Sequence, residues 1–590
     1  ELPITVCIGN PPYSIGQKSA NDNAQNLSYP KLDSRIMNTY AANSKASLRR
    51  SLYDNYIKAF RWASDRIKNN GIVAYITNGS YIDNQGMDGV RKCLIEEFTS
   101  IYVFNLRGNA RTSGEQRRKE KDNVFGVGTR TSVAITILVK KKNKKRDLFI
   151  HYYDIGDYLS REHKLSRISR FNSVKNIEWK HIAPDKNNDW INRRNESFKK
   201  LIPLAPDKKD NVHSKSIFID NVIGTVTSRD AWLYNFSNNK LKNNVNIMID
   251  YYNSERERLL NKNGEVKVDT SKISWSRGLK NKKKNNENIE YDDNKRIRTI
   301  YRPFVKENMY FDKNVIESPG RAQLLFSDEN IIISLSGIGS SKPFSCLMLK
   351  SIPCLDTVEK SQCFPLYWYE EKHNNTLFGK QNIIKYDAIT DYIKNKIEKQ
   401  YLKEINKKDI FYYVYGILHS EVYRNTFASD LKKSLPRIPI VDKYEDFVAF
   451  SNAGKKLADL HLNYESVKPY SKCKIYIYPG ANYKVTKMKF GKSKNNNKDK
   501  TIIEYNEKIT ISNIPEKAYE YIVNGKSAIE WIMERYAIST DKKSGIVNDP
   551  NDWCKEVNDE KYIFNLLLRI INVSIQTVDI VNSLPKLNID

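Results

Sequence analysis

The first 140 residues alternate between strand-like and helix-like patterns of hydrophobic positions. Apolar and β-branched runs predict four strands, at residues 4–8, 71–77, 101–106 and 132–139. Helical spacing predicts one helix between Leu48 and Ile67 and a second from Asp88, its expected N-cap, to Phe98. The polar, Arg-rich segment 107–130 shows no helical pattern, so we expect it to be a loop that joins the last two strands as an antiparallel pair. This order of elements predicts one half of a doubly wound α/β domain.

After about residue 150 the periodicity becomes mixed, with short strand-like runs, long polar stretches and many Tyr and Asn residues. Helical spacing predicts further helices, at residues 409–419, 423–434, 453–462 and 527–536. Three basic segments are expected to be solvated connectors or flexible loops, at residues 140–146, 280–284 and 492–500, and a phosphate contact is the alternative for 140–146. No fixed-period repeat is present, which argues against a solenoid or a propeller.

Charge narrows the class of partner. The 590 residues include 98 Lys and Arg against 69 Asp and Glu, a formal net charge of +29, and the sequence pI is about 9.4. A content of 40% hydrophobic and 11% aromatic residues can form buried cores, so global disorder is excluded. An excess of positive charge of this size favours a polyanionic partner, nucleic acid ahead of an acidic membrane surface.

Neither a membrane anchor nor a disulfide scaffold is apparent in the sequence. No run approaches the roughly 18 apolar residues that span a bilayer, and the first ten residues contain neither a basic nor an apolar signal region. We therefore expect a cytoplasmic protein without membrane association. The seven cysteines form no CxxC pair, so we expect reduced structural residues and no metal site.

The tetrapeptide Asn10-Pro11-Pro12-Tyr13 follows the first predicted strand and is the most informative motif in the chain. The two prolines cannot continue a strand ladder, and ligands of open α/β sheets lie just beyond the carboxyl ends of strands. An ordinary Asn-Pro turn is the alternative interpretation. We favour a functional one, because a chance match that also follows a strand and opens an α/β half-domain is rare.

The groups of this tetrapeptide suit an exocyclic amine on a purine, whose nitrogen lone pair is delocalised into the ring. If the Asn10 side-chain carbonyl and the Pro11 backbone carbonyl each accept one amine hydrogen, the lone pair becomes localised on the nitrogen and no strong base is required. Neither Pro11 nor Pro12 has an N–H to donate, so the turn presents acceptors from a rigid backbone. Tyr13 offers an aromatic face on which a flipped base can stack, a contact worth roughly 1–3 kcal/mol.

This motif resembles motif IV of the amino-methyltransferases that use S-adenosylmethionine, which is NPPY, DPPY or a close variant. The resemblance implies that Asn10 to Tyr13 hold the target amine and that the cofactor is S-adenosyl-L-methionine. Enzymes with this motif methylate adenine N6 in DNA, glutamine in release factors or bases in ribosomal RNA, so the motif alone leaves the substrate open. The long, basic, Tyr-rich region that follows argues against a glutamine enzyme, which is a compact single domain.

Further motifs narrow the resemblance. FNLRGNAR at 104–111, NVFG at 123–126 and the strand at 132–139 resemble motif VIII of the adenine enzymes. Six later segments are similar to the C-terminal half of type ISP restriction-modification enzymes: TSRDAW at 227–232, YRPF at 301–304, GILHS at 416–420, LPRIP at 435–439, LADLH at 457–461 and SGIVNDP at 544–550. Type ISP enzymes are single polypeptides that join a nuclease, a helicase-like translocase, an adenine methyltransferase and a target-recognition domain.

The resemblance implies the C-terminal half of a doubly wound, Rossmann-like methyltransferase domain at 1–146, followed by a large mixed α+β region. That region would comprise a linker with the first part of the recognition region at 147–300 and a target-recognition domain at 301–590. The expected partners in a bacterial cytoplasm are double-stranded DNA and the helicase, nuclease and cofactor-binding segments upstream in the same polypeptide. No nuclease constellation and no GxxxxGK[ST] loop is recognisable in the 590 residues, so cleavage and translocation would reside elsewhere.

Further residues are expected to act on DNA. Phe125 matches the motif VIII aromatic that would sandwich the flipped base with Tyr13, and a core Phe beside a strand is the alternative. Five residues of the matched motifs are candidates for DNA contact: Arg107, Arg111, Arg229, Trp232 and Arg302. A structural Arg–Trp stack is the alternative for Arg229. His419 and His461 lie in helical patterns without metal-ligand spacing, so we expect structural roles for both.

In the family, a glycine-rich turn that binds S-adenosylmethionine precedes motif IV. We therefore expect the cofactor-binding residues upstream of Glu1, with the chain a C-terminal fragment. A permuted enzyme is the alternative, with Gly337-Ile338-Gly339 as its cofactor turn, although the nearby Pro343 argues against a βαβ unit. The leading hypothesis is a site-specific adenine-N6 DNA methyltransferase with its recognition region. A non-catalytic DNA-specificity module and an RNA methyltransferase are the alternatives.

Overall fold

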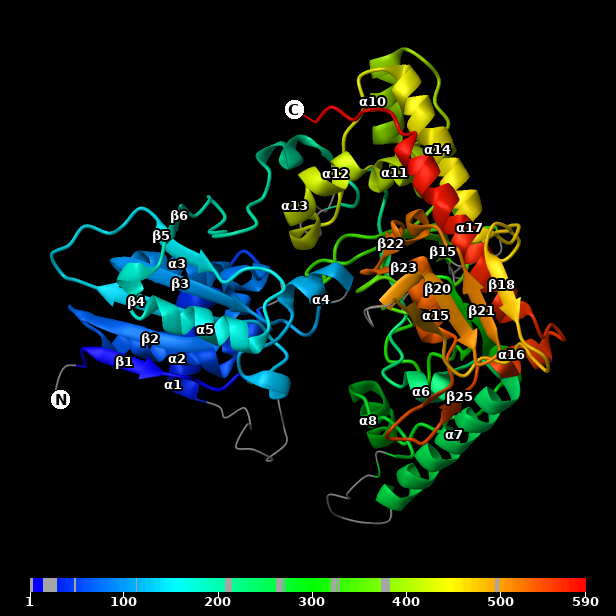
Figure 1. Cartoon of the computed structure of the whole chain (residues 1–590), viewed down its shortest axis with the longest axis horizontal. Helices are drawn as coiled ribbons and strands as arrows, with labels where there is room; N and C mark the ends of the chain where they lie inside the picture. Colours follow the sequence, from blue (N-terminus) through cyan, green and yellow to red (C-terminus); the bar gives the residue numbers. More distant parts are fainter. Residues whose placement is uncertain are drawn as a thin grey trace. The chain divides into compact units, whose positions relative to one another are not determined.

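The computed structural model of the chain divides into two compact units, Glu1–Asn195 and Glu196–Asp590, which are described separately (Figure 1). The structure describes residues 4–13, 29–46, 49–112, 114–206, 215–260, 269, 271–319, 325, 329–372, 382–493 and 498–589.

The first unit is built around a six-stranded sheet in the order β1-β2-β4-β3-β5-β6. β1 pairs parallel with β2, β4 lies antiparallel between β2 and β3, and β3 pairs parallel with β5. β1, β2, β3 and β5 therefore run in one direction, and their carboxyl ends meet at one edge of the sheet. The strands span Val6–Gly9 (β1), Gly71–Asn78 (β2), Ser100–Arg107 (β3), Val133–Lys140 (β4), Ile150–Asp154 (β5) and Lys180–Ile182 (β6).

Helices cover both faces of this sheet (Figure 1). Phe60 of α2 and Leu94 of α3 share one buried core with the strand residue Val103. The next residue along β3, Phe104, points to the opposite face, where its ring packs edge-on against Phe171 of α5 with 5.9 Å between centroids. The helices of this unit are α1 (Pro30–Ile36, continued by a π-helix at Met37–Ala41), α2 (Asn55–Arg66), α3 (Asp88–Glu97), α4 (Gly114–Glu120) and α5 (Arg161–Phe171).

The structure confirms the predicted strands and the mixed α/β class, and β3 and β4 pair antiparallel as expected. Two local predictions are wrong. Asp88 is the first helical residue of α3 rather than its N-cap, and its carboxylate accepts hydrogen bonds from Ser44 Oγ at 2.5 Å and from the Lys45 amide at 2.8 Å. The segment predicted to be a loop contains α4, whose residues GEQRRKE favour a helix. Leu48 lies outside the described residues.

The first unit also continues beyond Arg146. β5 adds to the sheet through its parallel pairing with β3, and α5 and β6 follow it. These elements complete the unit, which ends at Asn195.

The second unit contains many short strands, and the strands that pair in its sheets do so antiparallel. Its larger sheets have the orders β10-β11-β9, β13-β12-β14-β8 and β18-β21-β20-β19. The strands are β7 (Ile202–Pro203), β8 (Val222–Ile223), β9 (Tyr234–Asn235), β10 (Arg296–Arg302), β11 (Val305–Tyr310), β12 (Ile332–Leu335), β13 (Cys346–Leu349), β14 (Gln362–Pro365), β15 (Tyr367–Lys372), β16 (Asn382–Asp387), β17 (Arg437–Ile438), β18 (Lys474–Ile477), β19 (Lys489–Lys492), β20 (Lys498–Asn506), β21 (Ile509–Ser512), β22 (Ile522–Val523), β23 (Lys526–Ser527), β24 (Ser539–Thr540) and β25 (Val547–Asn548).

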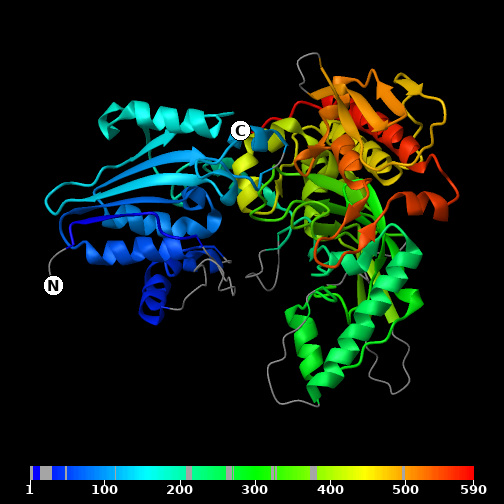
Figure 2. The ribbon, with the colours of Figure 1, turned by 60° about the horizontal axis from the view of Figure 1, so that its bottom comes forward.

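The helices of the second unit include those predicted at 409–419, 453–462 and 527–536, which are α11, the end of α14 and α15. The helix predicted at 423–434 is divided into α12 and α13. The basic run 280–284, predicted to be a loop, belongs to α8, which packs beside α7 (green in Figures 1 and 2). The helices are α6 (Asp230–Leu233), α7 (Asn238–Leu260), α8 (Arg277–Lys284), α10 (Asp391–Tyr401), α11 (Lys407–His419), α12 (Glu421–Thr426), α13 (Ala428–Lys433), α14 (Tyr444–Leu462), α15 (Ala528–Arg535), α16 (Asn551–Glu556) and α17 (Tyr562–Asn582).

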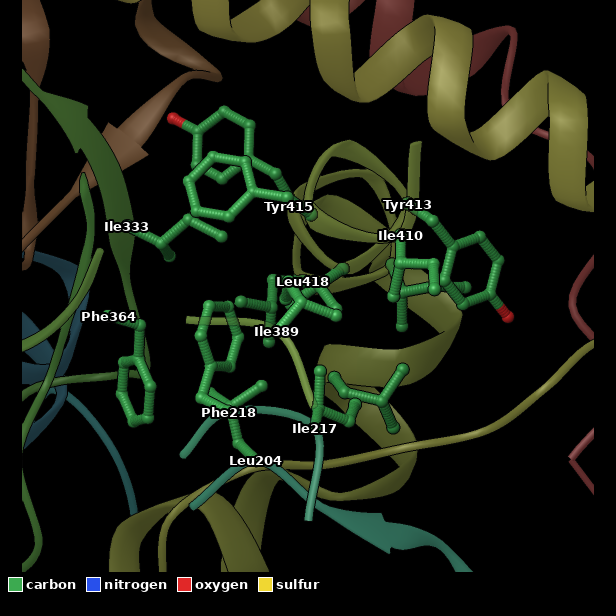
Figure 3. Packing of buried hydrophobic residues seen from close by; sticks show 14 of the residues in the cluster. Leu204, Ile217, Phe218, Ile333, Phe364, Ile389, Ile410, Tyr413, Tyr415 and Leu418 are labelled. Atoms are coloured by element: carbon green, nitrogen blue, oxygen red, sulfur yellow. The ribbon is translucent and has the colours of Figure 1, made fainter. Parts of the chain in front are cut away.

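The core of the second unit forms where α11 packs against strands and against α14. Figure 3 shows Leu418 of α11 among Phe218, Phe364 and other apolar side chains of this core. α11 and α14 approach closely at Gly416 and Gly454, because a Cβ at Gly454 would lie 1.9 Å from a backbone oxygen of α11. α17 is long and apolar enough to span a bilayer, but most of its apolar window is buried inside the unit, as in the core helix of a globular domain.

A buried cation ties α3 to the end of the first unit. The Arg91 side chain is fully buried and donates to the backbone oxygens of Tyr81, Asn84 and Asn188 at 2.6–2.9 Å. Its guanidinium also pairs with the buried Asp189 carboxylate at 3.1 Å. Because a buried charge is tolerated only when it is paired and hydrogen-bonded, these contacts must form together.

We predict that Arg91→Met lowers the free energy of unfolding of the first unit by about 3–5 kcal/mol, because it removes one partner of a buried pair and leaves three carbonyls without a donor. Denaturant unfolding of the purified chain measures this loss. The control is Lys92→Met on the same helix, where the side chain is 38% exposed and the expected change is below about 1 kcal/mol. Equal effects of the two substitutions would contradict the prediction.

Candidate active site at the carboxyl edge of the sheet

The tetrapeptide Asn10 to Tyr13 begins where β1 ends, at the carboxyl edge of the sheet. Asn10 and Pro12 are exposed, whereas Pro11 and Tyr13 are half-buried. The Tyr13 hydroxyl donates to Asn10 Oδ1 at 3.3 Å. An amide oxygen has two lone pairs, so this contact leaves Asn10 Oδ1 able to accept a hydrogen from a ligand.

Tyr13 is supported from α2. Its ring packs edge-on against the buried ring of Tyr56, with 6.1 Å between centroids and an interplanar angle of 83°. Burial, with a smaller contribution from the Asp54 carboxylate, raises the pKa of Tyr13 to about 12. The phenol is therefore neutral at physiological pH, and its ring is available for stacking without adding a negative charge to the site.

The segment that resembles motif VIII lies at the same edge, because β3 ends there and β4 begins there. Gly108 has a φ of +88° and lies so close to the next turn that a Cβ would be 2.8 Å from the Asn123 Cα. The Asn123 amide donates to the backbone oxygens of Gly108 and Thr131 at 3.1 and 2.8 Å, and its Oδ1 accepts from the Phe125 amide at 3.0 Å. Asn123 thus closes the loop at both ends, and Phe125 remains 43% exposed.

The two motif VIII arginines differ in their surroundings. The Arg107 guanidinium binds the carboxylates of Asp154, at 2.6 Å, and Asp157. Arg111 is exposed, and its backbone amide donates to Asn109 Oδ1 at 3.0 Å. Of these two predicted DNA-contact residues, Arg111 is the one with its side chain at the surface.

The remaining predicted DNA-contact residues lie in the second unit. Arg229 is inside the protein, where its guanidinium donates to the Val315 oxygen and to Ser276 Oγ, and burial lowers its pKa to about 10. Trp232 is 6% exposed and belongs to the same core. Their burial is a correction to the prediction of DNA contact and favours the structural alternative for Arg229, since neither side chain is available to a phosphate or a base in this structure.

Arg302 belongs to a separate polar cluster of the second unit. Its guanidinium lies over the Tyr301 ring, 3.9 Å from the centroid, and donates to the Tyr301 backbone oxygen at 2.7 Å. The Tyr301 hydroxyl in turn donates to Asp230 at 3.1 Å. The TSRDAW and YRPF motifs are therefore in direct contact, which the sequence alone did not indicate.

The glycine turn considered for a permuted cofactor site does not fit that role. β12, which precedes it, pairs antiparallel with β13 and β14, so no βαβ unit forms. A Cβ at Gly337 would lie 2.3 Å from the Lys360 backbone oxygen, so this glycine is required by close packing. The Gly339 amide donates to the Lys432 oxygen at 2.8 Å, and Glu359 binds the hydroxyls of Ser340 and Ser341. These groups are occupied by the protein itself.

A cavity beside α5 and the potential metal-binding side chains give no second candidate site among the described residues. A cavity of about 480 Å³ opens between α5 and the sheet, but its lining, which includes Phe104, Phe171 and Trp179, contains no acidic or basic side chain and no cysteine. Within the part of the chain that the structure describes, no three His, Cys, Asp or Glu side chains form a group that could hold a metal ion. His461 is buried between the Tyr415 hydroxyl and Thr577 Oγ1, at 2.7 and 3.0 Å.

Comparison with known proteins defines the class. Residues 216–566 match the model of the Type ISP C-terminal specificity domain, so the chain belongs to the type ISP restriction-modification enzymes. Among proteins of curated function, none matches the chain significantly.

Solved structures identify individual relatives. A nuclease-deletion mutant of the Type ISP enzyme LlaGI, in complex with a DNA substrate mimic, is 41% identical with a TM-score of 0.87, over 99% of this chain and 53% of that chain. The ATP-dependent Type ISP enzyme LlaBIII, bound to DNA, is 39% identical with a TM-score of 0.87, over 100% and 37%. The DrdV–DNA complex is 32% identical with a TM-score of 0.84, over 99% and 57%. The present chain thus spans about half or less of the length of LlaGI and LlaBIII.

We predict that Gly108→Ala opens the motif VIII loop, because the added methyl group meets the Asn123 backbone and the residue must keep a left-handed φ. Gly126→Ala is a matched control, since Gly126 also has a positive φ, +81°, but has open space around its Cβ position. Hydrogen exchange of the Ala110 and Phe125 amides measures the opening. We expect exchange at least tenfold faster than wild type in Gly108→Ala only. Similar exchange in both variants would mean that close packing at Gly108 does not hold the loop.

Proposed function

We propose that the first unit is the catalytic half of a site-specific DNA adenine-N6 methyltransferase and that the second unit recognises the DNA target. The observation that carries this proposal is the position of Asn10 to Tyr13, with their acceptors and aromatic ring, just beyond the carboxyl end of a parallel strand. The family membership of the chain and the resemblance of the tetrapeptide to motif IV support it.

In this proposal the chain prepares the amine of a flipped adenine. Asn10 Oδ1 and the Pro11 carbonyl each accept one amine hydrogen, which localises the nitrogen lone pair. As the nitrogen gains a methyl group it becomes positively charged, and the two carbonyl dipoles stabilise that charge before a proton is lost. Tyr13 and Phe125 hold the base by its two faces. The neutral phenol of Tyr13 supplies a face for stacking without competing as a charged acceptor.

S-adenosylmethionine would supply the methyl group. The described residues offer no turn that fits it, so we propose that a separate cofactor-binding segment packs beside β1. β1 is the outermost strand of the sheet, and its Val6 and Ile8 side chains are 54% and 78% exposed. An apolar outer strand of this kind is normally covered by another element.

DNA binding by the chain is supported by its charge, and DNA recognition is supported by the relatives. The chain has a net charge of +29, and the LlaGI, LlaBIII and DrdV structures contain DNA or a DNA mimic. Lys and Arg side chains, with Arg111 of the first unit among them, would bind phosphates and set the register of the duplex, while base edges specify the sequence. We propose a cytoplasmic location, where this DNA is found.

The test is methyl transfer by the full-length native polypeptide, with labelled S-adenosylmethionine and genomic DNA from a host that lacks adenine methylation. We predict that Asn10→Ala lowers kcat about a hundredfold to a thousandfold and Tyr13→Ala about tenfold to a hundredfold, since a lost preorganised acceptor and a lost stacking face cost about 3–4 and 1–3 kcal/mol. Tyr13→Phe retains the ring and is expected to stay within threefold of wild type.

Wild-type transfer rates in Tyr13→Ala would refute the role of this ring. Site-specific DNA binding by the wild type without any methyl transfer would instead support a non-catalytic specificity module. Transfer to structured RNA in preference to duplex DNA, assayed side by side, would support an RNA methyltransferase.

A further inference from the structure

We infer that Lys164, on α5, is a positioning residue that fixes the loop carrying Phe125 at the carboxyl edge of the sheet. The inference rests on the proposed function, because it gives Lys164 a role through the base-holding ring of Phe125. α5 lies outside every motif that the sequence indicated.

The Lys164 ammonium joins three separate points of the chain. Its side chain is fully buried, and Nζ donates to the backbone oxygens of Leu106 at 2.9 Å, Glu120 at 3.0 Å and Asp122 at 2.7 Å. Leu106 lies at the end of β3, Glu120 is the last residue of α4, and Asp122 leads into the NVFG segment. Three N–H donors thus meet three carbonyls, which uses every donor of the ammonium.

This arrangement is costly unless it is complete. Burial lowers the pKa of Lys164 to about 8, and the carboxylates of Glu120, Asp122 and Asp154 offset this effect only in part. An apolar side chain of similar length would avoid the buried charge, but it would leave three carbonyls facing it without donors. Loss of the ammonium is therefore expected to change the conformation of the loop, because neither a strand ladder nor a helix supplies other donors to these three carbonyls.

A second contact from α5 reaches the residue next to Phe125. Arg161 Nε donates to the Val124 oxygen at 3.0 Å. The anchors therefore hold the backbone on the N-terminal side of Phe125 while its ring remains 43% exposed. A loop aromatic whose backbone is fixed but whose ring is not buried is arranged to contact a ligand, whereas a core Phe would be fixed by packing of the ring itself.

The first experiment compares steady-state methyl transfer by the full-length polypeptide, with genomic DNA that lacks adenine methylation as substrate. Lys164→Met is expected to lower kcat about tenfold or more and to leave KM for S-adenosylmethionine within twofold. The matched control is Lys140→Met. Lys140 lies at the other end of β4, where its Nζ also donates to a backbone oxygen, that of Ile67, at 3.1 Å. The control is expected to retain wild-type kcat.

A double-mutant cycle separates positioning from general stability. If Lys164 acts through Phe125, then Lys164→Met in the Phe125→Ala background lowers kcat by less than about twofold, although each single substitution lowers it strongly. If the fold-loss of kcat in the double variant equals the product of the fold-losses of the two single variants, the inference is overturned.

Arg161→Met provides a milder variant in case Lys164→Met does not fold, because Arg161 is exposed on the first turn of α5. It should raise hydrogen exchange at the Phe125 amide and lower kcat severalfold. Unchanged exchange and unchanged kcat in this variant would count against the inference. If the wild type transfers methyl groups and Lys164→Met has the same kcat, the inference is overturned and the proposed function stands. If the wild type transfers no methyl group, the proposed function and the inference are both overturned.

Discussion

The antiparallel insertion of β4 between β2 and β3 is the constraint on which the rest of the first unit depends. Because β3 runs towards the carboxyl edge of the sheet and β4 runs away from it, the segment between them must lie at that edge. The parallel pairing of β1 with β2 brings Asn10 to the same edge. A parallel strand in place of β4 would need a crossover that returns the chain to the opposite edge first. Strand direction therefore brings two motifs that are distant in the sequence to the same edge of the sheet.

The basic side chains of the chain have two roles, one as buried cations that bind backbone oxygens and one as exposed cations available to a polyanion. Arg91, Lys164 and Arg229 are buried, and each donates to backbone oxygens in connecting segments or at the ends of strands and helices. Cations with several donors suit this purpose, because connecting segments have carbonyls that no ladder satisfies. Net charge therefore overstates the surface available to a polyanion, and exposed residues such as Arg111 must be distinguished from buried ones by structure.

The sequence was sufficient where a signal is local. β-branched runs located the four strands, and a tetrapeptide after the first of them located the candidate site. It was insufficient where the signal is a long-range contact. The role of α5 depends on Lys164 meeting carbonyls of β3 and of the segment after α4, and no spacing within α5 encodes those partners. Arg229 and Gly337 resembled functional residues for the same reason. An Arg near a Trp is found in buried cores as well as in DNA-binding sites, and a Gly-x-Gly turn is found at close packing contacts as well as in cofactor sites.

The candidate site depends on rigid geometry more than on charge. Its acceptors are a side-chain amide and a proline carbonyl, and its aromatic groups are a neutral phenol and an exposed Phe ring. Carbonyl dipoles stabilise a developing positive charge only if they already point at the nitrogen, because reorienting them during the reaction would consume the gain. The prolines restrict the acceptor turn from within, and the buried Lys164 ammonium restricts the loop of Phe125 from outside. The Lys164 ammonium thus lies behind the loop of the proposed site, where it holds backbone in place, and the groups offered to a neutral base are carbonyls and aromatic rings.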